Sequence, residues 1–360
     1  GVVPGGTMAT EPLSAARSDG SSSAEALDRR SLTGSQIVLL IGSLLGGGAV
    51  GLLLLARVFV SIPTDVRRLG ILIQAMHAEE SSPELVVFGN SILMSGVDAR
   101  ALGAALPESP VAWNCASTGQ ILLESYLLSQ DLPDTVEVGV YGIFPRPATN
   151  REELHAQKYN TLFMYGYRPT PATLDTVRRI YGSDELELLE RSAISQIFAS
   201  RWAIRQFVDT RARSLLRSDL ALDKATYDLF HPQSYTNVID AAITERFVAK
   251  RLEEFAAAPP TLGSDTVELA IQIAREADAK GRMTIFLFPP LHPDLLETVR
   301  AEMLAVEESF RDALAGAPDV RILNAADLLD GSQFIDDMHP TNAGAMILSE
   351  YLADVIREDR

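Results

Sequence analysis

Two short segments of the chain contain side chains that together can perform acyl-transfer chemistry. Gly89-Asn90-Ser91 follows the apolar run Leu85–Phe88, so a serine comes directly after an expected buried strand. Asp336-Asp337-Met338-His339-Pro340 precedes a helical pattern near the C-terminus. A carboxylate three residues before a histidine can accept from Nδ1–H and leave Nε2 as a base, and such a base activates a serine hydroxyl. Taken separately, each segment also fits a plainer interpretation, a tight turn and a solvated histidine.

The sequence around these segments predicts a parallel sheet covered by helices. Short apolar runs typical of buried strands alternate with amphipathic stretches typical of helices. The expected strands are 85–88, 111–113, 136–141, 284–288 and 320–323, and the expected helices are 98–106, 120–130, 265–279, 293–314 and 343–356. This alternation predicts a three-layer α/β fold of the flavodoxin-like kind, with its site at the carboxyl ends of the strands.

A long insertion interrupts the alternation between the third and fourth strands. Residues 148–262 are mostly helical in pattern, and Pro259-Pro260 marks their end. Such an insertion forms either a lid or partner surface, or a subdomain that only stabilises the fold. The α/β domain is therefore expected at 83–147 and 263–360.

The N-terminal part of the chain predicts a membrane anchor. Residues 1–35 are rich in Gly, Ser and charge, which predicts a disordered tail. The segment 36–60 contains twenty uncharged residues in a row, Ile37 to Ala56. At about 1.5 Å per residue this run spans a hydrocarbon layer of roughly 30 Å, so we predict an uncleaved transmembrane helix rather than a buried core helix. Residues 61–82 are predicted to contain a connecting helix.

Composition excludes several classes of function. The chain has 360 residues, with 31 basic against 48 acidic side chains and a net charge of −17, and no run of Lys or Arg. Without a basic face, binding to a nucleic acid backbone is not expected. The single cysteine, Cys115, excludes an intrachain disulfide and a multi-cysteine metal site, and we interpret it as a buried thiol. No metal and no cofactor are assigned.

Three segments in combination resemble one known family. Gly89-Asn90-Ser91 after the first strand, Asn114–Gly119 after the second, and Asp336-x-x-His339-Pro340 before the last helix are similar to the motifs of the SGNH/GDSL hydrolase superfamily. The resemblance covers about residues 83–145 and 263–357. It implies a serine esterase or acyltransferase on an SGNH-type α/β fold.

The resemblance also implies a role for each matching residue. Ser91 corresponds to the nucleophile, His339 to the general base and Asp336 to the residue that orients it. The backbone N–H groups of Ser91 and Gly119 correspond to oxyanion donors. The usual Gly-Asp-Ser is Gly-Asn-Ser in this chain, which leaves the serine in place.

One motif of the family is missing. The third block, normally Gly-x-Asn-Asp, reads Gly142-Ile143-Phe144-Pro145, so the side-chain oxyanion donor is absent. Losing one such donor costs about 10²- to 10³-fold in rate unless another group replaces it. Asn114 is a substitute if its strand turns it towards the serine.

The anchor, the altered third block and the insertion together resemble one branch of the superfamily, the anchored SGNH-like proteins that act with membrane-bound O-acyltransferases. This implies an acyltransferase or esterase on O-acyl groups of a cell-envelope polysaccharide, with the α/β domain on the extracytoplasmic, periplasmic side of the cytoplasmic membrane. The alternative is a non-catalytic glycan-binding or assembly partner of such an O-acyltransferase. A lipase that uses the anchor at the lipid surface is a third possibility.

Further side chains are expected near the same edge of the sheet. We predict that Asn90, beside the serine, and His292, after the fourth strand, contact substrate; a rigid prolyl loop is the plainer interpretation of the second segment. Arg146, Arg151 and Lys158 follow the third strand, and we interpret them as solvated surface charge rather than as contacts to an anionic glycan.

Overall fold

The computed structural model describes residues 33–60, 67–78, 82–147, 162–163, 167–183, 187, 189–190, 241–317 and 319–359. The chain divides into two compact units, residues 1–50 and 51–360. The predicted disordered tail and much of the predicted insertion lie outside the described residues.

The predicted anchor segment forms one continuous helix, α1 (Gly34–Val60). Within the part of the chain that the structure describes, no helix combines the length and the apolar character needed to cross a membrane. The transmembrane anchor therefore stays a prediction.

The predicted parallel sheet is present and has five strands. In spatial order they are β2 (Ala112–Asn114), β1 (Leu85–Phe88), β3 (Val138–Gly142), β6 (Met283–Phe288) and β7 (Val320–Asn324). All neighbouring strands in this order run parallel. Their carboxyl ends therefore share one edge of the sheet, which is where a parallel α/β fold presents its site.

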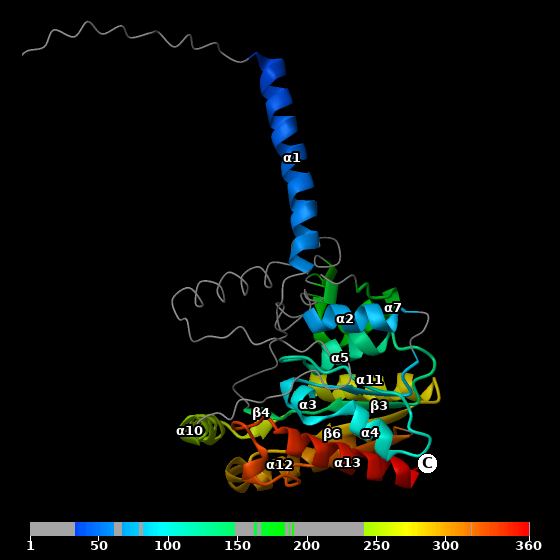
Figure 1. Ribbon diagram of the computed structural model, residues 1–360, viewed down its shortest axis with the longest axis vertical. Coiled ribbons are helices and arrows are strands. Elements are labelled where there is room, and N and C mark those ends of the chain that lie inside the picture. The colour runs from blue at the N-terminus through cyan, green and yellow to red at the C-terminus, as the bar shows by residue number, and fades with distance from the viewer. Residues whose placement is uncertain are drawn as a thin grey trace, which may run out of the picture. The chain divides into compact units, whose positions relative to one another are not determined.

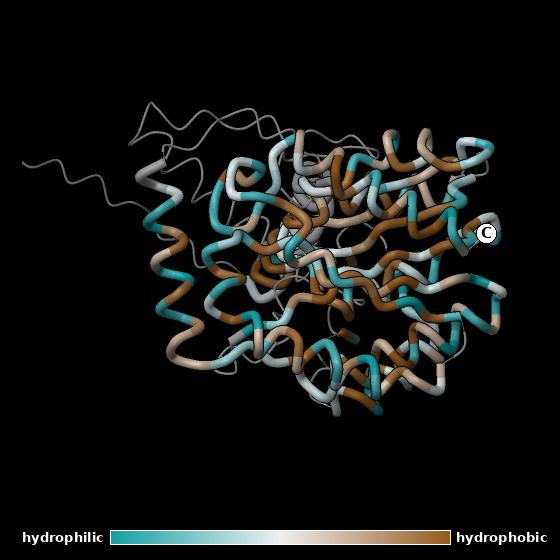
Figure 2. Tube along the Cα trace, turned by 90° about the horizontal axis from the view of Figure 1, so that it is seen from below, coloured by the Kyte–Doolittle hydropathy of each residue, from teal (hydrophilic) through white to brown (hydrophobic). Residues whose placement is uncertain are grey.

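Both faces of the sheet are covered, which is why its strands are apolar throughout. Along β1, successive side chains point to opposite faces, so Leu85 and Val87 join one core cluster and Val86 and Phe88 the other. All four are fully buried. Figure 2 shows the hydrophobic stretches in brown running through the middle of the α/β unit, with hydrophilic segments at its rim.

The helices form a layer on each side of the sheet. One layer contains α3 (Ser91–Gly96), α4 (Ala99–Ala105) and α13 (Asn342–Asp359); the other contains α5 (Leu122–Ser129), α11 (Ser264–Asp278) and α12 (Pro293–Leu314). In Figure 1 α5 and α11 lie above the labelled strands β3 and β6, and α13 lies below them. The structure thus confirms the predicted α/β class with three layers.

Two further helices extend the second layer. In α2 (Arg67–Met76), inside the predicted connecting segment, the residues Leu69, Leu72, Ile73 and Met76 are buried in the core. In α7 (Pro171–Tyr181), from the predicted insertion, Val177 is buried in the same cluster. In both segments the apolar side chains recur every three or four residues, so they share one face of the helix, and that face packs against the core.

The two residues just before the predicted insertion pair with two residues near its end. Arg146–Pro147, β4, and Pro260–Thr261, β5, form a two-stranded antiparallel sheet, with Arg146 opposite Thr261. The helix α10 (Ala241–Ala257) ends just before β5 and packs against both α12 and β4. This small sheet was not predicted, and it holds α10 beside the carboxyl edge of the main sheet.

Candidate active site

Ser91 takes its position from the strand before it and the helix after it. Asn90 is the N-cap of α3, and its Oδ1 accepts a hydrogen bond from the backbone N–H of Ile92 at 2.9 Å. Ser91 is therefore the first residue of the helix, where a backbone N–H has no acceptor within the helix itself. That N–H and the serine hydroxyl both lie at the carboxyl end of β1.

The turn before the serine needs a small residue. A Cβ atom at Gly89 would lie 2.8 Å from Cδ1 of Leu93, one turn into α3. Without a side chain at this point, the strand can pass directly into the helix. Glycine in the Gly-Asn-Ser segment thus brings Ser91 to the edge of the sheet.

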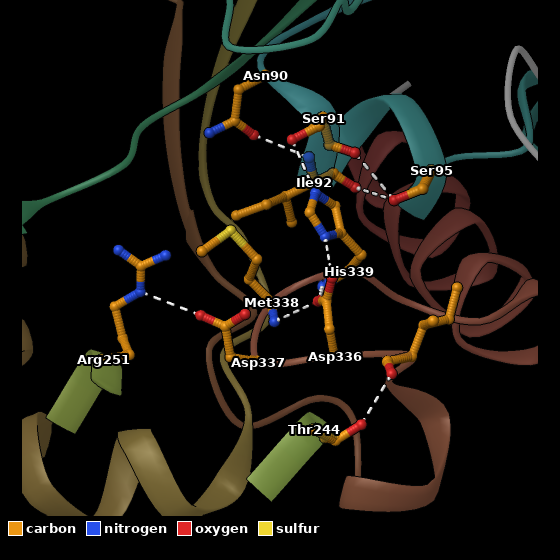
Figure 3. Close-up of polar contacts among 11 residues, drawn as sticks. Asn90, Ser91, Ile92, Ser95, Thr244, Arg251, Asp336, Asp337, Met338 and His339 are labelled. Carbon is orange, nitrogen blue, oxygen red and sulfur yellow. Dashed lines mark hydrogen bonds and ion pairs between the residues drawn. The ribbon is translucent and has the colours of Figure 1, made fainter. Parts of the chain in front are cut away.

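His339 lies beside the serine in the orientation that a general base requires. Its Nε2 is 2.8 Å from Oγ of Ser91, and its Nδ1 is 2.7 Å from Oδ2 of Asp336. Figure 3 shows this chain of contacts running from the carboxylate through the ring to α3. With a carboxylate at Nδ1, that nitrogen carries the proton, and Nε2 is left to accept one from the serine hydroxyl.

Asp336 also shapes the backbone that carries His339. Its Oδ1 accepts from the backbone N–H groups of Met338, at 2.9 Å, and His339, at 2.8 Å. The N–H of Ile335 donates to the carbonyl of His339 at 2.9 Å, which closes the segment into a tight loop. The Asp336 carboxylate thus holds both the His339 ring and the backbone loop that carries it.

The same contacts keep Asp336 ionised. Burial by itself raises the pKa of this carboxyl group, but the hydrogen bond from the His339 ring, the charge of that ring and the two backbone N–H groups lower it by more. The pKa of Asp336 consequently lies below its ordinary value. An ionised carboxylate at this position stabilises the imidazolium that forms when His339 accepts a proton.

Asn114 does not supply the missing oxyanion donor, and this prediction is wrong. Its side chain is fully buried, and its Nδ2 donates to the carbonyl oxygens of Leu93, at 2.9 Å, and Val97, at 2.8 Å. Its Oδ1 accepts from the N–H of Ala116 at 3.0 Å. The amide therefore ties the end of β2 to the C-terminal end of α3.

Gly119, the other predicted donor, does lie at the site. It lines the same cavity as Ser91, and its φ of 62° is in the left-handed region that favours glycine. Its loop is held to the nucleophile turn by the N–H of Ser117, which donates to the carbonyl of Gly89 at 3.0 Å. The use of the Gly119 N–H as an oxyanion donor stays a prediction. Cys115, at the start of this loop, is fully buried, as predicted.

His292 is not among the described residues that line the cavity, so the structure does not support the predicted substrate contact. It is 8% exposed, it is the N-cap residue of α12, and its Nδ1 accepts from the N–H of Asp294 at 3.4 Å. Its ring lies 5.4 Å from that of Phe334. His292 therefore starts a helix and packs in the core. Asn90 does line the cavity, and its contact to substrate stays a prediction.

A cavity of about 320 Å³ opens at Ser91, and its wall is mostly apolar. Phe144 forms part of that wall. The described lining residues are Asn90, Ser91, Ile92, Gly119, Phe144, Pro145, Arg146, Arg251, Phe255, Pro289, Pro290, Leu291, Leu295, Met303 and Met338. The cavity can therefore hold an apolar acyl group next to the nucleophile.

Sequence reasoning missed the part that α10 plays in this site. The Nε of Arg251 donates to Oδ2 of Asp337 at 3.0 Å, and Oγ1 of Thr244 donates to the carbonyl of Ile335 at 3.1 Å (Figure 3). The segment between Ile335 and Asp337 leads directly to His339. The helical pattern of α10 was visible in the sequence, but nothing in that pattern indicates which residues its polar side chains contact.

Comparison with known proteins adds little to this geometry. The chain matches no protein-family model and no curated protein. Among solved structures, it is similar to one described as a candidate platelet activating factor from Streptococcus pneumonia, with 12% identity and a TM-score of 0.39. The match covers 86% of this chain and 99% of that one.

Proposed function

We propose that the protein is a serine-dependent esterase or acyltransferase. The observation that carries the proposal is the chain of short contacts from Ser91 to His339 and on to Asp336, 2.8 Å and 2.7 Å long. Nε2 of His339 takes the hydroxyl proton while Oγ of Ser91 bonds to the acyl carbon of an ester. The ester C–O bond breaks, and the proton held by His339 passes to the departing alcohol. Water or a second hydroxyl, activated by the same base, then releases the acyl group.

The oxyanion formed in this reaction requires donors. We propose the N–H groups of Ser91 and Gly119, two residues that both line the cavity. With Phe144 in the third block, the side-chain donor of the family is missing, and two backbone donors are expected to leave the rate about 10²- to 10³-fold below that of a three-donor site.

The acyl groups that we propose as substrates are O-linked to a cell-envelope polysaccharide outside the cytoplasmic membrane. The sequence resemblance to the anchored SGNH-like branch and the apolar run within 36–60 support this part of the proposal. In this proposal the segment 36–60 is the anchor, and a membrane-bound O-acyltransferase is the partner that supplies or receives the acyl group.

The test is covalent labelling of the purified full-length chain with a fluorophosphonate, which traps activated serines. We expect Ser91→Ala and His339→Ala to lose the label. The matched control is Ser95→Ala, because Ser95 lies one turn further along α3 and its hydroxyl donates to the carbonyl of Ser91 at 2.9 Å. Label that persists in Ser91→Ala, or a folded wild type that takes no label, would contradict the proposal. Circular dichroism on each variant checks folding.

A second function is favoured by one observation, the aromatic ring of Phe144 in the cavity wall. A non-catalytic glycan-binding or assembly partner of an O-acyltransferase has no need of a third oxyanion donor. Acylation of the envelope polysaccharide in cells that carry Ser91→Ala separates the two functions. Acylation that persists indicates the assembly role, and acylation that is lost indicates an acyl-serine enzyme.

A further inference from the structure

Two arginines lie in the wall of the cavity at Ser91. Arg146 comes from β4 and Arg251 from α10, and the remaining lining residues are apolar or uncharged. Among the described residues that line the cavity, none is an aspartate or a glutamate. A guanidinium group in a largely apolar wall loses part of its hydration, so an anion bound there interacts with it more strongly than one bound at an open surface.

The fold holds these two arginines on one side of the cavity. Arg146 pairs with Thr261 in the small sheet of β4 and β5, and α10, which carries Arg251, packs against β4. Neither position belongs to the main sheet or to the loops that supply Ser91 and His339. The strand that leads into the insertion and a helix within the insertion thus contribute the charged part of the wall, while the loop after β1 contributes the nucleophile.

Arg251 is oriented by two carboxylates. Its Nε donates to Asp337 at 3.0 Å, and its Nη1 donates to Glu254 at 2.7 Å. Figure 3 shows the two terminal nitrogens of the guanidinium pointing away from Asp337. These two bonds use two of the five N–H donors of the group, and a fork held in this way loses little conformational freedom when it binds a carboxylate or a phosphate.

Arg146 carries the charge that remains uncompensated. Asp337 and Glu254 offset the charge of Arg251, whereas Arg146 forms no ion pair within the described part of the chain. Arg146 is partly buried and lines the cavity, so the interpretation of this residue as solvated surface charge is wrong. Removing Arg146 should consequently change the charge preference of the cavity more than removing Arg251, which contributes oriented donors.

We propose that the substrate is an anionic acyl ester, whose carboxylate or phosphate group binds Arg146 and Arg251 while its acyl carbonyl lies at Ser91. This inference rests on the proposed ester chemistry and narrows its substrate class. The chain as a whole has a net charge of −17, so long-range attraction of an anion is not expected. The selectivity instead comes from contacts made inside the cavity, and it appears in KM more than in kcat.

The experiment compares three acetyl esters of similar size on the full-length chain: 4-acetoxybenzoate, 4-acetoxyphenyl phosphate and the neutral methyl 4-acetoxybenzoate. We expect kcat/KM for one or both anionic esters to exceed that for the neutral ester about tenfold to a hundredfold, the range that hydrogen bonds to a charged group provide. The carboxylate and phosphate arms identify which anion the site prefers.

Variants test whether the two arginines cause that preference. Arg146→Gln should remove most of the preference, so that the ratio of kcat/KM for the anionic ester to kcat/KM for the neutral ester falls towards one. Arg251→Gln should remove part of it, and its thermal unfolding is measured in parallel because Asp337 loses its partner. The matched control is Arg300→Gln, since Arg300 pairs with the exposed Asp327 at 3.9 Å and does not line the cavity. A preference that is absent in the wild type, or unchanged in Arg146→Gln, overturns the inference.

Binding measurements distinguish a failure of the anion subsite from a failure of the proposed ester chemistry. Amide analogues that cannot turn over quickly, 4-acetamidobenzoate, 4-acetamidophenyl phosphate and methyl 4-acetamidobenzoate, are titrated into Ser91→Ala by calorimetry. Tighter binding of an anionic analogue supports the anion subsite even if no ester is hydrolysed, in which case the ester chemistry alone has failed. Equal binding of charged and neutral analogues overturns the subsite even if the neutral ester is hydrolysed by Ser91.

Discussion

Two of the three His-Pro dipeptides in the chain lie in its described part, each just before a long helix, and their two histidines have different surroundings. His339-Pro340 precedes α13, and the ring of His339 contacts Ser91 and Asp336. His292-Pro293 begins α12, and the ring of His292 lies against Phe334. The dipeptide itself therefore does not decide whether a histidine acts as a base.

The position of the neighbouring carboxylate accounts for the difference. Asp336 comes three residues before its histidine, so the loop can curl back and bring Oδ2 to 2.7 Å from Nδ1. Asp294 comes two residues after His292, is 69% exposed, and its Oδ2 stays 3.8 Å from Nδ1. Nδ1 of His292 instead accepts a backbone N–H, as an N-cap does. Nδ1 is a donor in His339 and an acceptor in His292, and a base needs the first arrangement.

The largest expected effect comes from exchanging the two carboxylates for amides. Asp336→Asn should lower kcat/KM for an acetyl ester about 10⁴-fold, because the amide favours the wrong tautomer of His339 and does not stabilise its protonated form. The matched change Asp294→Asn should stay within about twofold of wild type. Initial rates with 4-nitrophenyl acetate measure both. Similar losses in the two variants would show that the comparison of the two loops is wrong.

A smaller effect, on stability rather than on activity, is expected at His292. His292→Ala should lower the free energy of unfolding by about 1–3 kcal/mol, since it removes a helix cap and a buried ring, while esterase activity stays within a few-fold. His292→Asn keeps a capping side chain and should recover part of the loss. Urea unfolding followed by circular dichroism measures both variants. Unchanged stability in His292→Ala would remove the structural role assigned to this residue.

The smallest effect concerns pH. The pKa of Asp336 is lowered in the folded chain, so its carboxylate adds to stability at pH values above the pKa of an unfolded aspartate, about 3.9. That contribution is lost as the pH falls through the lower, folded pKa. The difference in unfolding free energy between wild type and Asp336→Asn should therefore be constant near neutrality and narrow below about pH 4. If the stability difference between wild type and Asp336→Asn widens in acid, the pKa of Asp336 is raised in the folded chain and the expectation is wrong.

Most of the sheet could be predicted because local pattern and burial coincide there. The expected strands 85–88 and 284–288 and the expected helix 293–314 match β1, β6 and α12 within a residue. These segments are apolar along their whole length or on one helical face. Their secondary structure can therefore be predicted without knowing which elements they pack against. The pairing of Arg146 with Thr261 left no such signal, because strands of two residues containing proline have no period to detect.

The candidate site was predictable where one residue positions another nearby in the chain. Asp336 and His339 are three residues apart, and Asn90 caps the helix that starts at Ser91, so local geometry fixes both pairs. The direction of a side chain at the end of a strand depends instead on what packs above it. For that reason Asn114, which contacts the end of α3, was wrongly predicted to face the serine.

The contacts of α10 limit how far the protein can be shortened or can diverge. A segment that leaves and rejoins the fold at one short antiparallel pair would ordinarily be free to vary in length or to be lost. Here Asp337, with only 8% of its side chain exposed, depends on Arg251 for its partner. Deletion of the whole segment would remove the guanidinium that pairs with Asp337, two residues before His339. We therefore expect a minimal active fragment to need α10, and natural variation in the segment to be concentrated outside that helix.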